Sequence, residues 1–315
     1  MPSSSDILRC PCPHHSTLNR TDDQQYICQC SEGEDTNGGN HFFPLVNGKP
    51  VMIFSDSPFC DRGSVINTSA QSVIRRHAGI QKFVSKLIFG NPVGDKQAIN
   101  SLLSYMQETS KPIRVLVIGA GEGSILHNRA ENLEGVEVIG VDVYDSQATQ
   151  IICDAHELPF ADAVFDAVII QAVLEHVIEP KTVVGEIYRV LKTAGVVYAE
   201  TPFMQQVHEG RFDYTRFSHL GHRWLFRMFE EVRSGVLKGP GTAFLWSLRY
   251  LIASIIGNKR IAALLVLPLF WLRFLDYIAR PSNAHDSASE YFFLGRKSHV
   301  SLTYEELIAG YRGAQ

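Results

Sequence analysis

Short apolar runs alternate with stretches of helical periodicity through the middle of the chain. The apolar runs occupy residues 113–121, 136–143, 165–173 and 195–203. Between the last two, Val184, Ile187, Tyr188 and Leu191 recur at helical spacing, and we expect Gly195 to end that helix. This alternation predicts parallel strands joined by crossover helices. We therefore predict an α/β fold with a doubly wound, mostly parallel sheet.

The alternation of strands and helices is confined to this region, and the rest of the chain has other patterns. We therefore predict five segments. They are a small β-rich module at 1–58, a helical linker at 59–110, the core at 111–238, an apolar helical hairpin inserted at 239–287, and a closing strand with the C-terminal tail at 288–315. Closely spaced cysteines distinguish the first segment, and apolar positions at helical spacing distinguish the second.

The apolar insertion has two apolar runs within 243–278, divided by Lys259 and Arg260. Each run is shorter than the roughly 20 residues that a helix needs to cross a bilayer. Three interpretations remain: a hairpin packed over the sheet or in a dimer, a lid over the substrate, or a pair of helices in peripheral contact with a membrane.

Net charge and the first ten residues bear on the expected partners and location of the protein. A formal net charge of -4 gives no electrostatic reason to expect a nucleic-acid partner. Residues 1–10 lack the basic start and apolar core of a secretory signal, so we expect a cytoplasmic protein, with membrane association left open by the insertion.

A glycine-rich turn follows the first predicted strand. Gly119, Gly121 and Gly123 give the spacing GxGxG, and Ser124 stands where a dinucleotide-binding turn has its third glycine. Asp142 ends the next strand, about 20 residues on, where a carboxylate can accept hydrogen bonds from ribose hydroxyls. Asp154 ends the third predicted strand. Taken singly, the glycine loop could be an ordinary tight turn, Asp142 a helix cap and Asp154 a solvated loop residue. Their order and separation together favour a nucleoside site.

The order and spacing of these runs resembles the type 11 family of class I S-adenosylmethionine (SAM)-dependent methyltransferases, over roughly residues 110–235. The resemblance implies a Rossmann-like seven-stranded sheet and SAM as cofactor. It implies that Asp142 holds the ribose, Asp154 the adenine amine, and that Gln171 and Glu175 lie along the methionine end. The cofactor-binding residues expected are Gly119, Ala120, Gly121, Gly123, Asp142, Val143, Asp154, Ala155, His156 and Gln171. Val117 departs from the family, which often has an acidic residue there.

The segment after the run 195–203 is dense in titratable and aromatic residues. Ligands of open α/β sheets bind beyond the carboxyl ends of the strands, so this segment is expected to meet the methyl acceptor. His208 is the first candidate for a base, with Glu209 as its orienter and Tyr214 or His219 as acceptor contacts. For any one of these residues, capping or packing on the next helix is an equal alternative.

Four cysteines form two pairs near the start of the chain. Cys10, Cys12, Cys28 and Cys30 could bind one zinc ion, with His14 and His15 close by, although CxC is tighter than the usual CxxC. The run from Leu8 to Phe54 resembles zinc-ribbon-like modules that precede some methyltransferases, and a ribbon that has lost its metal is the alternative.

Three functions follow from these features. The first is a SAM-dependent methyltransferase acting, by O-methylation, on a small-molecule, saccharide (glycan) or lipid-linked acceptor. The second is a nicotinamide-dependent oxidoreductase, which Ser124 and the lack of a convincing Tyr-x-x-x-Lys pair disfavour. The third is a non-catalytic scaffold protein with the same fold, which Val117 keeps open.

Overall fold

The computed structural model describes residues 6–12, 14–21, 25–28, 41–54, 57–58, 60–67, 95–108 and 112–315. The chain divides into two compact units, and each is described by itself. The first unit comprises Met1–Ser72, Leu103–Ile170 and Ile178–Val197, and the second comprises Val73–Leu102, Gln171–Val177 and Tyr198–Gln315. In the predicted helical linker, α1 (Arg62–Asn67) and α3 (Lys96–Glu108) are helical, while 68–94 lies outside the described residues.

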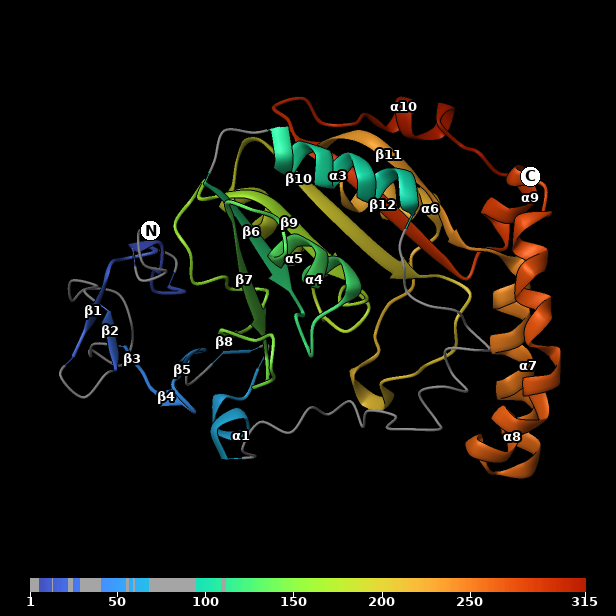
Figure 1. The fold of residues 1–315 in the computed structure, drawn as a ribbon, viewed down its shortest axis with the longest axis horizontal. Helices are drawn as coiled ribbons and strands as arrows, with labels where there is room; N and C mark the ends of the chain where they lie inside the picture. Colours follow the sequence, from blue (N-terminus) through green and yellow to red (C-terminus); the bar gives the residue numbers. More distant parts are fainter. Residues whose placement is uncertain are drawn as a thin grey trace. The chain divides into compact units, whose positions relative to one another are not determined.

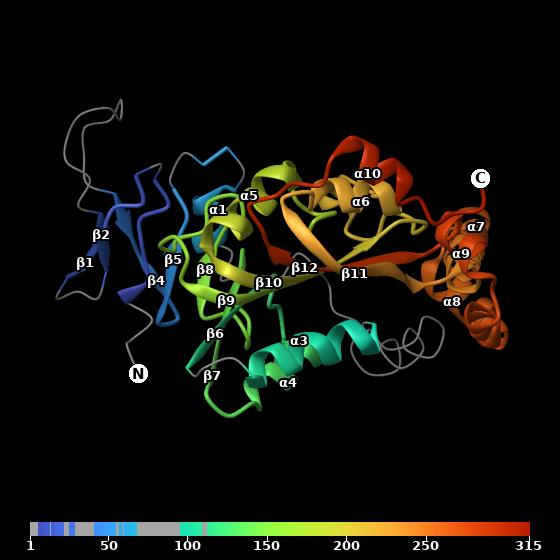
Figure 2. The same ribbon diagram turned by 90° about the horizontal axis from the view of Figure 1, so that it is seen from above.

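The first unit is built on a mostly parallel sheet with the order β10-β9-β6-β7-β8-β5-β4. Strand β6 pairs in parallel with both β7 and β9, and β7 pairs in parallel with β8. Helices α4 and α5 cover opposite faces of this sheet (Figure 2), so the doubly wound α/β prediction is confirmed. The bounds are β6 (Ile113–Ile118), α4 (Ile125–Glu131), β7 (Val136–Asp142), β8 (Ile151–Cys153), β9 (Phe165–Gln171), α5 (Pro180–Val190) and β10 (Leu191–Pro202).

The central strands are apolar on both faces because helices cover both sides of them. Val115, Leu116, Val168 and Ile169 have no exposed surface. A continuous apolar run is what a strand of a covered parallel sheet requires. The core of the first unit therefore lies directly behind the glycine turn that follows β6.

Gly195 does not end the helix before it, and that prediction was wrong. Helix α5 ends at Val190, Leu191 already has an extended backbone, and Gly195 lies inside β10. A Cβ at position 195 would lie 2.9 Å from the carbonyl oxygen of Lys192 and 3.1 Å from that of Asp166. Glycine is needed here for a close approach of backbone to backbone, which the sequence does not distinguish from a helix cap.

The N-terminal segment contributes to two sheets. Strands β1 (Leu18–Arg20), β2 (Tyr26–Cys28) and β3 (Phe42–Phe43) form a small sheet of their own. The hairpin of β4 (Leu45–Val46) and β5 (Lys49–Met52) instead joins the large sheet, because β5 pairs in parallel with β8. The predicted β-rich module is present, and its last two strands extend the edge of the main sheet.

In the second unit, β11 (Phe229–Lys238) and β12 (Glu290–Lys297) form an antiparallel pair next to the end of β10. With them, all seven strands implied by the family resemblance, β6 to β12, are present. Helices α6 (His219–Leu225) and α10 (Tyr304–Ala309) lie side by side over this pair, as Figures 1 and 2 show.

The apolar insertion forms α7 (Pro240–Ile256), α8 (Lys259–Val266), a 3-10 segment η3 (Leu267–Tyr277) and α9 (Pro281–Asp286). Leu245 of α7 and Val266 of α8 are fully buried in one apolar cluster. Asp276 accepts hydrogen bonds from the N–H of Gly241 (2.7 Å) and the hydroxyl of Thr242 (2.6 Å), which fixes η3 to the start of α7. No helix among the described residues is long and apolar enough to cross a membrane.

Candidate active site

The turn after β6 is held in place by backbone hydrogen bonds to β7. The N–H groups of Gly119 and Ala120 donate to the carbonyl oxygen of Val141, at 2.9 and 3.0 Å. Gly119 and Gly121 have positive φ values of 70° and 52°, a conformation that glycine adopts without steric cost. The chain can therefore turn sharply here and expose its backbone to a ligand.

Asp142 is fixed beside this turn by two backbone donors. Its Oδ2 accepts the N–H of Gly121 at 2.9 Å, and its Oδ1 accepts the N–H of Val143 at 2.8 Å. Each carboxylate oxygen can accept more than one hydrogen bond, so a ribose can still be bound. The structure thus brings the predicted ribose ligand and the predicted glycine turn together.

Gly140, in β7, also shapes this turn, although no sequence motif distinguishes it. A Cβ on Gly140 would lie 2.0 Å from the carbonyl oxygen of Ala148 and 2.9 Å from the Cβ of Ala120. The loop containing Ala148 is in turn bonded to the glycine turn, since Ala148 N–H donates to the Gly121 carbonyl at 3.3 Å. The glycine turn therefore also requires a glycine at position 140, in the adjacent strand β7.

Asp154 and His156 lie directly after β8 and bond to each other. Asp154 Oδ1 accepts the His156 N–H at 2.8 Å and lies 2.5 Å from the His156 Nδ1. The His156 Nε2 accepts the N–H of Glu179 at 3.2 Å, which fixes the imidazole with its proton on Nδ1. Both side chains are buried. Ala155, between them, is also buried, so the three residues expected to contact adenine lie together in a hydrogen-bonded loop directly after β8.

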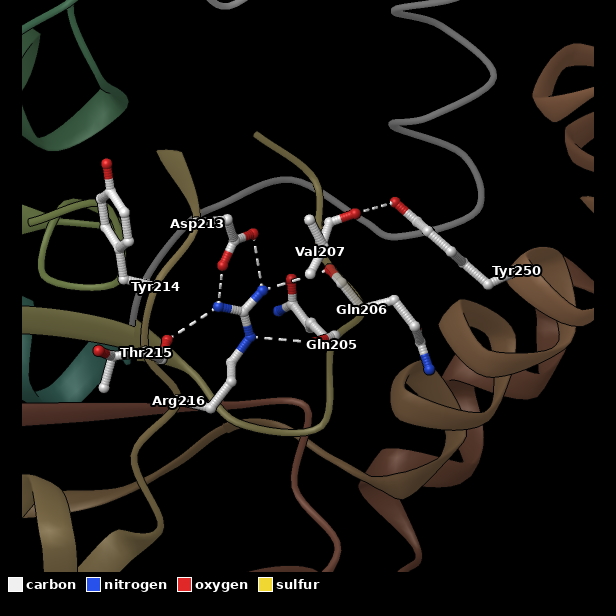
Figure 3. A pocket seen from close by; sticks show the side chains of 8 residues that line it. All are labelled: Gln205, Gln206, Val207, Asp213, Tyr214, Thr215, Arg216 and Tyr250. Atoms are coloured by element: carbon white, nitrogen blue, oxygen red, sulfur yellow. Dashed lines mark hydrogen bonds and ion pairs between the residues drawn. The ribbon is translucent and has the colours of Figure 1, made fainter. Parts of the chain in front are cut away.

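In the second unit, the loop after β10 is organised around Arg216. Its guanidinium forms a bidentate ion pair with Asp213 and donates to the carbonyl oxygens of Gln205 and Thr215 (Figure 3). Burial raises the pKa of Asp213, but hydrogen bonds from Arg216 and from the His208 N–H outweigh it and lower that pKa to about 2. This ion pair holds the loop in one conformation.

A cavity of about 460 Å³ lies along this loop. Its lining residues are Gln205, Gln206, Val207, Asp213, Tyr214, Thr215, Arg216 and Tyr250 (Figure 3). The Tyr250 hydroxyl, from α7, donates to the Val207 carbonyl at 2.5 Å, so the apolar helices are tied to the loop that lines the cavity.

A second cluster lies in the same unit, around the buried carboxyl of Glu175. The Nε2 atoms of His176 and His208 lie 3.5 and 3.9 Å from the Glu175 Oε1. Neither Glu175 carboxylate oxygen has a hydrogen-bond partner among the described residues. Burial raises the pKa of Glu175 to about 8, and burial lowers the pKa values of both histidines. The three groups are therefore uncharged together near neutral pH.

Comparison with known proteins agrees with this geometry. Residues 116–199 match a family model described as a methyltransferase domain. These residues form a SAM-dependent methyltransferase domain. The match contains the whole glycine turn and Asp142, and it favours SAM over the nicotinamide alternative.

Individual relatives of the methyltransferase domain match short or diverged parts of the chain. The ubiquinone/menaquinone biosynthesis C-methyltransferase of Desulfotalea psychrophila is 48% identical over 44 residues, which cover 14% of this chain and only 18% of that enzyme. Among solved structures, phosphoethanolamine N-methyltransferase 2 of Haemonchus contortus in complex with SAM gives a TM-score of 0.43 at 20% identity, covering 69% of this chain and 56% of that one. A putative sarcosine dimethylglycine methyltransferase from Galdieria sulphuraria gives 0.44 at 14% identity, covering 69% and 97%.

The remaining predicted ligands of the methyltransferase domain lie at strand ends. Ala120 is buried in the turn, and Val143, after β7, is 41% exposed. Gln171 ends β9 and forms a side-chain hydrogen bond with Glu200. Gly123 has a φ of 87° and precedes Ser124, whose hydroxyl caps α4 by accepting the His127 N–H at 3.0 Å.

Three of the four predicted catalytic residues lie in the segment between β10 and α6, and the fourth lies in α6. His208 belongs to the Glu175 cluster, and Tyr214, 47% exposed, lines the cavity. Glu209 precedes the short 3-10 segment Gly210–Phe212. His219 lies outside the Glu175 cluster, in α6, where it is buried against His285 and Tyr291 and hydrogen-bonds the Ser234 hydroxyl at 3.0 Å. Burial and nearby positive groups lower its pKa to about 3.

Sequence reasoning missed His176 as a partner of His208. It follows Glu175 directly, and its ring meets that of His208 edge-on with centroids 5.1 Å apart. The only signal in the sequence was the adjacency of a glutamate and a histidine after a predicted strand, which does not reveal that a distant loop supplies a second imidazole.

Three of the four predicted metal ligands come together. The thiols of Cys10, Cys12 and Cys28 are buried and lie within 4.8 Å of one another. Cys30 lies outside the described residues. His41, which was not predicted, places its Nδ1 3.6 Å from the Cys10 sulfur.

Proposed function

We propose that the protein is a SAM-dependent methyltransferase that methylates an acceptor oxygen. The observation that supports this most directly is Asp142, held beside an exposed glycine turn by the N–H groups of Gly121 and Val143. The donor set fits SAM: the turn offers backbone N–H groups and close approach, Asp142 accepts from the ribose, and the Asp154 loop supplies the adenine contact. When bound, SAM supplies a methyl group on a sulfonium, and the electron pair of the broken S–C bond stays on sulfur.

An acceptor hydroxyl must lose its proton during such a transfer, and the Glu175 cluster supports this part of the proposal. Burial lowers the pKa values of His176 and His208, so each imidazole is neutral at pH 7 and can accept a proton. His208 is the first candidate for the base, and the structure adds a partner to it, since its Nδ1 lies 3.4 Å from the Asp213 Oδ2. Asp213 therefore takes the orienting role first assigned to Glu209.

The acceptor class we propose is a small molecule, saccharide or lipid-linked molecule that binds along the cavity. The lining combines an ion pair, two amides and two tyrosines, which suits hydroxyl groups. A lipid-linked acceptor is favoured by the exposed apolar side chains of the neighbouring helices. Large apolar side chains at least 40% exposed there are Phe244, Leu251, Ile255, Ile256, Ile261, Leu264, Leu265, Trp271, Phe274, Leu275, Tyr277 and Ile278.

Exposed apolar patches of this extent mark interaction sites, and we propose peripheral membrane contact through 243–278. Flotation with neutral and anionic vesicles measures it directly. We expect the wild-type protein to float with vesicles, and an Ile255→Glu, Leu264→Glu double variant to remain at the bottom. A wild-type protein that stays entirely unbound would remove this part of the proposal and leave methyl transfer standing.

We also propose a structural zinc ion bound by Cys10, Cys12 and Cys28, whose thiols lie within 4.8 Å of one another, with His41 or Cys30 as the fourth ligand. A tetrahedral zinc with Zn–S near 2.3 Å and Zn–N near 2.0 to 2.1 Å places sulfur and nitrogen about 3.6 Å apart. The Cys10 sulfur and the His41 Nδ1 have that separation, 3.6 Å. Three thiolates with one imidazole, or four thiolates, are common structural zinc sets, and the ion would join the N-terminal strands to one another.

Two measurements test the function itself. Calorimetry with SAM, S-adenosylhomocysteine and NAD is expected to give binding of the two sulfur compounds and none of NAD. Incubation with methyl-labelled SAM and fractionated cell extract then identifies the acceptor, by whether label enters lipid, glycan, small molecule or protein. If the protein binds neither SAM nor S-adenosylhomocysteine, the proposal is refuted.

A further inference from the structure

Two imidazoles and one carboxyl converge in the second unit, and no part of the methyl-transfer machinery described above requires all three. Their ligand atoms, from Glu175, His176 and His208, lie within 4.8 Å of one another. Glu175 has no exposed surface, and both its oxygens lack a hydrogen-bond partner among the described residues. Burying a carboxyl without partners is costly, so such a group usually has a ligand in the functional state.

The two imidazoles are oriented as metal ligands are. The His176 Nδ1 lies 2.8 Å from the carbonyl oxygen of Phe212, and the His208 Nδ1 lies 3.3 Å from that of Gln206. Donation from Nδ1 to a carbonyl leaves the lone pair on Nε2, and each Nε2 faces Glu175. Metal-binding histidines almost always donate their other N–H in this way.

The separations also fit one ion. Metal–nitrogen and metal–oxygen bonds of about 2.0 to 2.2 Å in a tetrahedral site place the ligand atoms about 3.4 Å apart. The observed nitrogen-to-oxygen separations are 3.5 Å for His176 and 3.9 Å for His208. His176 and His208 are partly exposed, at 18% and 23%, so an ion and a further ligand have access.

We propose that Glu175, His176 and His208 bind a divalent transition-metal ion, with zinc as the type case, whose open position receives the acceptor oxygen. Two histidines and a glutamate with an open fourth position form a catalytic zinc set, whereas magnesium and calcium prefer oxygen ligands alone. The inference rests on the proposed function, and in it the metal replaces His208 as the group that activates the same acceptor hydroxyl.

The chemistry balances without an oxidant or reductant. Coordination polarises the acceptor O–H bond, the proton leaves to a water molecule, and the oxygen keeps the electron pair with which it takes the methyl group. The charge near the site does not oppose a cation. Asp213 is ionised, Arg216 is neutralised by its bidentate pair with Asp213, and Glu175 becomes a carboxylate once the ion is bound.

Zinc content measures the site, and Glu200 provides a matched control. Glu200 is another buried glutamate of the second unit whose pKa burial raises, but its Oε1 accepts the Tyr198 hydroxyl at 2.6 Å. Each variant is stripped with chelator, incubated with zinc, desalted and analysed. We expect Glu175→Gln to hold one zinc per chain fewer than Glu200→Gln, and its remaining affinity at this site to fall by more than about 100-fold.

His176→Ala repeats the test if Glu175→Gln does not fold by circular dichroism. Equal zinc content in all three variants would overturn the metal site. Calorimetry with SAM separates this from the methyltransferase proposal: zinc-loaded wild-type protein that binds no SAM refutes the methyltransferase function alone, and methyl transfer that persists after chelation, at unchanged rate, refutes the metal alone.

Discussion

Gly140 faces the carbonyl oxygen of Ala148 so closely that a Cβ at position 140 would lie 2.0 Å from it. The obstacle is backbone, so a side-chain rotation cannot relieve it. Strand β7 and the loop that supports the glycine turn can therefore approach each other only with glycine at this position.

We expect Gly140→Ala to lower the free energy of unfolding by about 1 to 3 kcal/mol, the cost typical of overpacking, and to weaken SAM binding because the turn shifts. Urea unfolding and calorimetry measure the two effects. Gly185→Ala is the control: it lies within α5, a Cβ there meets nothing within 4 Å, and alanine is expected to raise stability by about 0.5 to 1 kcal/mol. Equal stability of the two variants would show that Gly140 is not constrained.

Asp142 gives a prediction about the cofactor alone. Hydrogen bonds to a charged group contribute about 1.5 to 3 kcal/mol each, so Asp142→Ala is expected to weaken SAM binding by roughly 10-fold to 100-fold or more. Asp142→Asn separates the loss of charge from the loss of the Gly121 contact. Asp145→Asn is the matched control, because Asp145 lies in the next loop and pairs instead with Lys49 at 2.6 Å. SAM affinity that is unchanged in Asp142→Ala would refute the assigned cofactor site.

The raised pKa of Glu175 predicts a pH-dependent stability. In chelator, the folded protein keeps this carboxyl protonated up to about pH 8, whereas the unfolded chain ionises it near its ordinary value of 4.5. The stabilising contribution is therefore present below pH 4.5 and is lost as pH rises towards 8, at about 1.4 kcal/mol per pH unit.

Glu175→Gln removes this titration, since glutamine resembles the neutral acid. We expect the variant to be more stable than the wild type at pH 7.5, to match it near pH 4.5, and to have lost metal binding. Urea unfolding at both pH values decides the matter. A wild type and variant with the same pH profile would mean that Glu175 is ionised in the folded protein.

The fold was predictable because its signals are local. Each central strand is a continuous apolar run, and the glycine turn with Asp142 lies within two adjacent elements. The parts that escaped prediction depend on contacts between distant segments. Gly140 is constrained by Ala148 and Ala120, which lie on other loops, and His176 becomes a candidate functional residue only because His208, on the segment after β10, contacts it. Glycine is a residue type typical of helix C-caps, but Gly195 instead lies close to the backbone of Asp166 in β9.

The cysteine site shows the same limit, because spacing alone favoured Cys30, while the described geometry places His41 beside Cys10, 31 positions along the chain.

The two alternatives for the fourth zinc ligand, His41 and Cys30, give opposite results. We expect Cys12→Ser to lose the N-terminal zinc and to weaken the small sheet of β1, β2 and β3, because the ion's binding energy is part of the folding energy of so small a sheet. His41→Ala and Cys30→Ser identify the fourth ligand, because the variant that removes it loses the zinc and the other keeps it. Cys60→Ser controls for the loss of a thiol outside the cluster. Zinc per chain in a Glu175→Gln background, where this is the one site proposed to remain, is the measurement; retention of zinc in His41→Ala together with its loss in Cys30→Ser would assign the fourth ligand to Cys30.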